Sequence, residues 1–162
     1  MENDDLKLLI CVVSGRRIAL GADAVVEILP LVPMWRPPTL PRPMLGFVTV
    51  RGVAVAVVAP ALLFDGAATI ETVGLYAHLV RVRDGYCLLV DRAEDMVSVA
   101  ADKVRAVDAG ASFGGMVTGV VSVAEGEAHV VALGRMLAEG ERMRIAALTA
   151  DAARRASEWA AA

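Results

Sequence analysis

The chain has 162 residues, of which 57% are hydrophobic and 22% charged, and its net charge is −3 at pH 7. This composition excludes a disordered chain, because enough apolar surface is present to form a core. The lack of a Lys- or Arg-rich stripe argues against nucleic acid as a partner. No apolar run approaches the roughly 20 residues that cross a bilayer, and the acidic segment Met1–Asp5 lacks the basic start of a secretory signal. We therefore expect a cytoplasmic globular protein, without direct membrane insertion, whose partners are other proteins.

The first half of the chain consists of short runs rich in Val and Leu, separated by Gly, Asp or Pro roughly every eight to twelve residues, which is typical of an all-β fold. The sequence predicts strands at residues 6–13, 18–20, 45–50 and 53–58, and one turn of helix at 60–64. Residues 24–29 predict a short helical or irregular turn that Pro30 ends. The proline-rich segment 30–43 predicts an extended connection, with a polyproline ligand for an aromatic groove as the alternative.

The second half continues this pattern after a polar surface loop at residues 65–72. It predicts strands at 73–83 and 86–90, and short strands or strand ends at 96–99 and 103–107. Asp84-Gly85 lies between the first two of these strands and predicts a hairpin with a primed turn. The glycine-rich stretch 110–115 lacks the Lys-Ser or Lys-Thr ending of a phosphate-binding loop, so we interpret it as a flexible linker.

The two halves resemble each other. Gly15 and Gly85 each open a return strand (RRIAL and YCLLV) that leads into a segment of acidic and apolar residues. Gly46 and Gly119 each begin a similar strand (GFVTV and GVVSV), and the two pairs of glycines are separated by almost the same number of residues. Such a repeat predicts two similar small barrels.

The end of the chain changes to a helical pattern, with a break at Gly140. Apolar residues then recur at helical spacing on one face, and they are Ile145, Leu148, Ala152, Ala156 and Trp159. We expect a terminal helix that packs on one of the barrels, and the alternative is a helix presented to a partner.

Side chains that often carry chemistry are present but isolated. Cys11 and Cys87 each lie in an apolar run without a second Cys or His at ligand spacing, so we expect two buried thiols. His78 and His129 likewise lack a neighbouring ligand or nucleophile. The sequence therefore predicts no metal site and no cofactor.

Catalysis finds little support elsewhere in the chain. Asp91 and Asp95 could form a carboxylate pair, but a role in a turn or a helix cap is favoured. The serines lack the context of a nucleophile elbow, and the aromatic content of 4% leaves no stacking platform for nucleic acid. We predict that the protein is not an enzyme.

Four stretches, taken in this order and at these distances, carry a resemblance to a known family. They are Val25-Val26-Glu27-Ile28; Leu40-Pro41 followed by Met44 to Gly52 (MLGFVTVRG); Leu88-Leu89-Val90-Asp91; and Gly119-Val120-Val121 followed by residues 130–137. With them the chain resembles the CheW-like chemotaxis coupling proteins over roughly residues 6–136.

The resemblance implies a mostly all-β fold of two five-stranded β-barrel lobes packed side by side, followed by a short C-terminal helix. It implies a CheW-like domain over residues 1–140 and a helical tail over 141–162. It also implies a non-catalytic adaptor that couples a chemoreceptor to a CheA-type histidine kinase. The partners would be the regulatory domain of the kinase, which is itself CheW-like, and the helical cytoplasmic tip of the receptor.

The resemblance further implies a set of partner-binding residues, namely Val25, Glu27, Gly46, Val48, Arg51 and Gly52. Arg51 at a hairpin end can donate charge-assisted hydrogen bonds across an interface, and Glu27 can offer a complementary charge. The alternatives are a solvated turn for Arg51 and a solvated face for Glu27. Gly46 permits a close backbone approach rather than a contact of its own.

Two other functions stay open at this point. One is a divergent CheW-like module that binds a single partner in a non-flagellar pathway. The other is a β-barrel that binds a small ligand, or an enzyme of unrecognised type that uses His78, His129 or Asp91.

Overall fold

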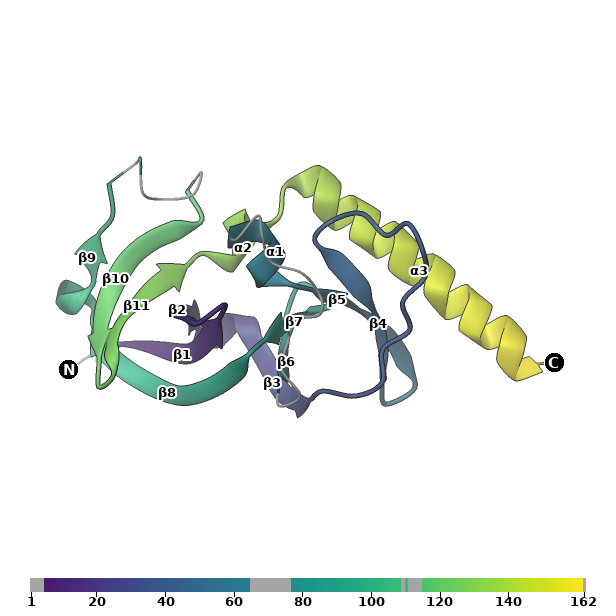
Figure 1. Cartoon of the computed structure of the whole chain (residues 1–162), viewed down its shortest axis with the longest axis horizontal. Helices are drawn as coiled ribbons and strands as arrows, with labels where there is room; N and C mark the ends of the chain where they lie inside the picture. Colours follow the sequence, from purple (N-terminus) through teal and green to yellow (C-terminus); the bar gives the residue numbers. More distant parts are fainter. Residues whose placement is uncertain (1–4, 65–76, 109, 111–114, 162) are drawn as a thin grey trace.

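The computed structural model of the chain describes residues 5–64, 77–108, 110 and 115–161. Its strands form two sheets that lie next to each other, and a long C-terminal helix runs along one of them (Figure 1). The strands are β1 (Asp5–Val13), β2 (Arg16–Gly21), β3 (Val25–Pro30), β4 (Met44–Val50), β5 (Val53–Val58), β6 (His78–Val82), β7 (Tyr86–Val90), β8 (Arg92–Ala100), β9 (Arg105–Ala106), β10 (Val117–Val123) and β11 (Gly126–Val131). The helices are α1 (Pro60–Phe64), α2 (Leu133–Met136) and α3 (Glu139–Ala161), with short 3-10 turns at η1 (Ala22–Ala24) and η3 (Ala101–Lys103).

The two sheets, which we name sheet A and sheet B, have related strand orders. Sheet A has the order β8-β1-β2-β11-β10-β9, and sheet B has the order β3-β6-β7-β5-β4. Each sheet contains one parallel pair, β2 with β11 and β5 with β7, and the other pairs are antiparallel.

The prediction of two five-stranded barrels is confirmed only as a mostly β fold of two lobes. In the described residues the outer strands of neither sheet pair with each other, so no barrel closes, and sheet A has six strands because it gains β9. Closure would require backbone hydrogen bonds between β3 and β4, which are the outer strands of sheet B. Their ends are joined instead by side chains, as described below.

The internal repeat corresponds to equivalent strands in the two sheets. However, neither half of the chain forms a lobe by itself. In sheet A the hairpin β1-β2 from the first half lies between β8 and β11 from the second half, and β10 pairs with β11. Conversely, in sheet B the hairpin β6-β7 from the second half lies between β3 and β5 from the first half, and β4 pairs with β5. The halves have thus exchanged strands, and each sheet needs both of them.

The sequence predicts a helical or irregular turn over residues 24–29, but Ala24 ends the 3-10 turn η1 and residues 25–30 form strand β3. β3 pairs with β6 in a register that places Glu27 opposite Arg81 and Ile28 opposite Val80. The β-branched residues of this segment suit a strand, and Pro30 is tolerated because it ends an edge strand. Pairing with a segment some 50 residues away therefore overrides the local signal.

Two other local predictions can be compared with the structure. As predicted, 96–99 is a strand end, that of the longer β8, which pairs with β1, and 103–107 contributes the short strand β9. The Asp84-Gly85 turn is not primed, because Gly85 has a positive φ of 89° but Asp84 does not. Primed geometry occurs instead at Ser14-Gly15 and Arg51-Gly52, where both residues have positive φ.

The remaining predictions agree with the structure where they can be compared. The strands near 6–13, 18–20, 45–50, 53–58 and 86–90 and the helical turn at 60–64 are confirmed. The segment before β4 is a connection without helix or regular strand, and it turns at residues 38–39 and 42–43. The predicted loop 65–72, the first residues of the predicted strand 73–83, and positions 111–114 of the predicted linker lie outside the described residues.

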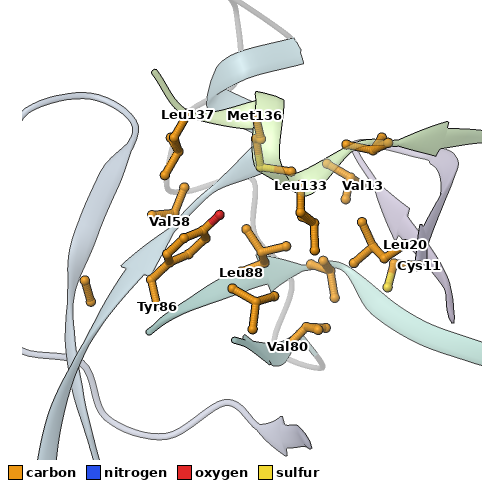
Figure 2. Packing of buried hydrophobic residues seen from close by; sticks show 14 of the residues in the cluster. Cys11, Val13, Leu20, Val58, Val80, Tyr86, Leu88, Leu133, Met136 and Leu137 are labelled. Carbon is orange, nitrogen blue, oxygen red and sulfur yellow. The ribbon is translucent and has the colours of Figure 1, made fainter. Parts of the chain in front are cut away.

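Buried apolar side chains form three clusters. The largest contains residues from both sheets, among them Leu20 and Val131 of sheet A and Val80 and Leu88 of sheet B, so it joins the two lobes. Figure 2 shows part of this shared cluster, with Leu133 and Met136 of the α2 region packed above Leu88. The other faces of the sheets carry separate clusters, which give sheet B and sheet A interiors of their own.

Helix α3 begins with one half of a capping box and packs on sheet B. The Glu141 carboxylate accepts a hydrogen bond from the Ala138 N–H at 2.8 Å, while Ala138 has no side-chain acceptor to complete the box. The helical segment is interrupted between α2 and α3 at residues 137–138. The predicted break at Gly140 is therefore wrong, because Gly140 lies inside the first turn of α3. Ile145 and Ala152 are buried and Leu148 is half-buried, which confirms the predicted apolar face there and the expectation that the helix packs on its own fold.

The apolar face of α3 does not stay buried to its end. Ala156 is exposed, and the side chain of Trp159 lies outside the described residues. In the described part of the chain no helix is long and apolar enough to cross a membrane.

Candidate protein-binding site

The six residues expected to bind partners all lie in sheet B. Val25 and Glu27 belong to β3, Gly46 and Val48 belong to β4, and Arg51 and Gly52 form the turn between β4 and β5. β3 and β4 are opposite outer strands in the order of the sheet. The sheet curls so that the β4-β5 turn nevertheless reaches β3.

Arg51 and Glu27, which we predicted separately, contact each other. The guanidinium of Arg51 donates two hydrogen bonds to the Glu27 carboxylate, at 2.5 and 3.1 Å, and Arg81 donates a third at 3.1 Å. We call Glu27, Arg51 and Arg81 the sheet B ion cluster. This bidentate arrangement orients the Arg51 side chain, which remains 65% exposed.

The electrostatics of the cluster follow from these contacts. Hydrogen bonds from Arg51 and then Arg81 lower the pKa of the Glu27 carboxyl, although partial burial opposes them. The same hydrogen bond raises the pKa of the Arg51 guanidinium. Glu27 therefore stays ionised, and the two arginines leave the surface of the cluster with excess positive charge.

Arg51 has an unusual backbone conformation. Its φ is 48° and that of Gly52 is 81°, the pattern of a type I′ turn. An arginine in this left-handed region costs about 1 kcal/mol or more relative to Asn or Gly. The turn thus holds a strained residue whose long side chain is fixed by Glu27 and still faces solvent.

Gly46 is required by a close approach of the backbone, as the sequence indicates. A Cβ atom at Gly46 would lie 2.4 Å from the Trp35 carbonyl oxygen, because Trp35 and Phe47 exchange two backbone hydrogen bonds of 2.8 Å beside it. Val48 is only 2% exposed and belongs to the interior of sheet B. Gly46 and Val48 thus shape β4 and do not present side chains at the surface.

Sequence reasoning missed several surface residues of this region. Arg81 completes the ion cluster, and its position opposite Glu27 depends on the β3-β6 register. Val26, Ile28 and Leu31 are 50%, 43% and 38% exposed and form an apolar edge along and just beyond β3. The apolar-polar-apolar order of Val26, Glu27 and Ile28 could have indicated a strand, but it covers too few residues to outweigh Pro30.

Sheet A contains a related ion cluster. Glu94 lies two residues into β8 as Glu27 lies two residues into β3. It pairs with Arg17 and with Arg92, each at 3.0 Å. The hydrogen bond from Arg17 is the main cause that lowers the pKa of the Glu94 carboxyl. Here the central carboxylate is only 15% exposed.

The two cysteines, one histidine and one aspartate considered above for chemistry are buried or bonded to the backbone. Burial raises the pKa of Cys11 to about 12 and that of Cys87 to about 11, and both are free thiols. His78 Nδ1 accepts a hydrogen bond from the Ala93 N–H at 3.1 Å, which links β6 to β8. Asp91 accepts a hydrogen bond from the Gly15 N–H at 3.3 Å, in keeping with a turn role.

In the described residues no group of three or more His, Cys, Asp or Glu side chains is close enough to hold an ion.

Comparison with known families decides what the fold represents. The family model for the CheW-like domain matches residues 7–140. The chain belongs to the CheW-like family. Members of this family are non-catalytic adaptors of chemotaxis signalling, and in general they couple receptors to the kinase CheA.

A solved structure of another CheW-like protein supports the same fold. The scaffolding protein TtCheW from Thermoanaerobacter tengcongensis matches with a TM-score of 0.70 at 15% identity, over 80% of this chain and 90% of that one. At this identity the likeness concerns the fold alone. Comparison with curated proteins found no match.

Proposed function

We propose that this CheW-like protein couples a chemoreceptor to a CheA-type histidine kinase and contacts a partner through the sheet B ion cluster. The observation that carries the proposal is Arg51, a strained and largely exposed arginine fixed by Glu27 at a hairpin end. Strained backbone positions persist only where the surrounding structure holds them, and they cluster at functional sites. Arginine is also one of the residues most enriched at interface hot spots.

The other proposed residues act around Arg51 in two ways. Gly52 permits the second left-handed position of the turn, and Val25 supports the start of β3 from a half-buried position. Gly46 and Val48 fix the course of β4 from inside the lobe. Only Arg51, Gly52 and part of Glu27 would touch a partner, together with the exposed apolar edge of β3.

The proposal is tested by calorimetric titration of the full chain, first with the regulatory domain of the CheA-type kinase from the same organism and then with a receptor-tip fragment. Arg51→Glu places a second carboxylate beside Glu27 and removes the presented guanidinium. We expect it to weaken binding at least tenfold, or about 1.4 kcal/mol.

Arg105→Glu is the matched control. Arg105 is also an exposed arginine paired with a glutamate, Glu127, but it lies on sheet A. It should leave the affinity unchanged. If the wild type binds neither partner, the coupling function is wrong for this protein, and if it binds only one, the single-partner alternative replaces it.

A further inference from the structure

Helix α3 lies after the part of the chain that matches the family, yet it covers a surface of that part. The match ends at residue 140, and α3 begins at Glu139. The helix packs against β5 and β4, and its C-terminal end extends past the sheet (Figure 1). The surface of sheet B beneath it therefore already accepts an α-helix.

Few contacts hold α3 in place. Among the described side chains of the helix, Ile145 and Ala152 are buried and join the cluster shared by the two sheets, and Leu148 packs against it from a half-buried position. A polar contact at its first turns is the Arg142–Asp84 pair, with a long N–O distance of 3.9 Å between partly exposed groups. Such a pair contributes little to stability.

One side of the helix leaves space against the sheet. A groove of about 440 Å³ lies between α3 and the β5-β7 region, lined among others by Val53, Tyr86 and Thr149. A second groove of about 430 Å³ follows toward the end of the helix and shares Val53, Ala54 and Ala153 with the first. Below α3 the Tyr86 hydroxyl is buried without a hydrogen-bond partner, a further sign of imperfect packing.

The second groove reaches the proposed binding site. It is lined by Thr49 and Gly52 on the hairpin and by Ala156 and Ser157 on the helix. Gly52 adjoins Arg51 in the turn, and Val53, which follows, is 57% exposed. A partner that engages Arg51 and continues along the hairpin would meet α3.

We propose that the face of sheet B beneath α3 is a helix-docking surface that α3 occupies within the same chain, and that a helix of the receptor tip competes with α3 for it. This inference rests on the proposed function. The competing helix would present apolar side chains at the spacing of Ile145, Leu148 and Ala152, with Arg51 at the end of the surface meeting an acidic residue. α3 is thus a built-in competitor that lowers the apparent affinity for this partner.

The effect on affinity follows from the docking equilibrium of α3. The apparent dissociation constant equals the intrinsic constant divided by the fraction of molecules in which the surface is free. A change that releases α3 tightens binding, and a change that improves its docking weakens binding.

Two full-length variants test these opposite effects by titration with the receptor-tip fragment. Ile145→Arg removes the main apolar contact of the helix and should tighten binding at least about threefold. Ala153→Leu fills the space that both grooves share and should weaken binding by a similar factor. Met143→Arg, at a position 68% exposed on the same helix, and Ala147→Leu, also exposed, are the matched controls and should bind like the wild type.

Hydrogen exchange on the same samples shows whether α3 has been released. Faster exchange of α3 amides in Ile145→Arg, with sheet B still protected, identifies undocking without unfolding. Unchanged affinity despite such undocking, or tighter binding by Ala153→Leu, overturns the inference and leaves the coupling function standing. Absence of binding by both the wild type and Ile145→Arg overturns the coupling function as well.

Discussion

At the scale of single residues, the structure depends on two glycines that occupy equivalent places in the two sheets. Gly46 and Gly119 each follow a register shift in the hairpins β4-β5 and β10-β11. At each of them a neighbouring segment crosses closely, Trp35 at Gly46 and Val104 to Arg105 at Gly119. A side chain at either position would push away the segment that covers the edge strand.

The first prediction concerns Gly46→Ala. The new methyl group would lie 2.4 Å from the Trp35 carbonyl oxygen, so the backbone must shift, and we expect a loss of about 2 kcal/mol in the free energy of unfolding. Gly21→Ala is the control, because its φ is −59° and no atom lies within 4 Å of the added carbon. Urea denaturation measures the free energy of unfolding of both variants, and equal stability of the two would contradict the close approach at Gly46.

The second prediction concerns pH and Glu94. In the folded protein the pKa of the Glu94 carboxyl lies below its ordinary value of 4.5. The ion pairs of Glu94 therefore contribute fully to the free energy of unfolding above about pH 5, and this contribution is lost as the pH falls below 4.5 toward the pKa of the folded state. We expect the free energy of unfolding to fall from about pH 5 to pH 3, and Glu94→Gln to fall less steeply.

The pH experiment has an internal comparison. Glu158→Gln removes a carboxylate from an exposed position of α3 and should keep the slope of the wild type. If the free energy of unfolding of Glu94→Gln fell with pH as steeply as that of the wild type, other carboxylates would govern acid stability. Glu27 should add to the acid loss in the same direction, because its carboxyl pKa is lowered as well.

At the scale of elements, a change in the turn of the β4-β5 hairpin should affect partner binding without affecting stability. Asn adopts the left-handed conformation more easily than Arg, so Arg51→Asn relieves strain in the type I′ turn while it removes the bond to Glu27. We predict stability within about 0.5 kcal/mol of the wild type, together with a clear loss of partner binding.

A turn of the same conformation in sheet A, between β1 and β2, gives the control for this third prediction. Ser14 has a φ of 51° and precedes Gly15, so Ser14→Asn makes the corresponding change where no binding residue is proposed. Thermal unfolding and calorimetric titration of both variants distinguish a role of Arg51 in partner binding from a role in stability. A strong loss of stability in Arg51→Asn would mean that the ion cluster serves the fold rather than a partner.

At the scale of the whole molecule, the exchange of strands makes the two lobes one cooperative unit. The shared cluster takes buried side chains from both sheets and from the α2 region, and each sheet contains strands from both halves of the chain. Neither half can complete a sheet by itself. We therefore expect both lobes to unfold in a single transition.

The fourth prediction uses Leu88, which is fully buried between the lobes. Leu88→Ala should cost about 3 kcal/mol, because the cavity is enclosed by both sheets. Val53→Ala, at a position 57% exposed, should cost little. Far-UV circular dichroism and tryptophan fluorescence should give coincident denaturation curves, and separate midpoints would show that the lobes unfold independently.

The sequence alone determined the strand content, most hairpins, the repeat and the family. These features depend on local patterns, such as apolar runs bounded by Gly and Asp, and on motifs such as MLGFVTVRG. It also identified Glu27 and Arg51 separately as charged positions and assigned Gly46 to a close backbone approach.

Only the tertiary structure decided how these pieces combine. β3 is a strand because β6 pairs with it, the halves exchange strands, and Arg51 meets Glu27 across the curl of sheet B. Local propensity contains no term for pairing with a distant segment, and the free energy that fixes such contacts comes from burial and hydrogen bonds formed only on folding. For the same reason the sequence favoured a terminal helix packed on the fold without indicating which surface it covers, whereas the structure places α3 over the hairpin that holds Arg51.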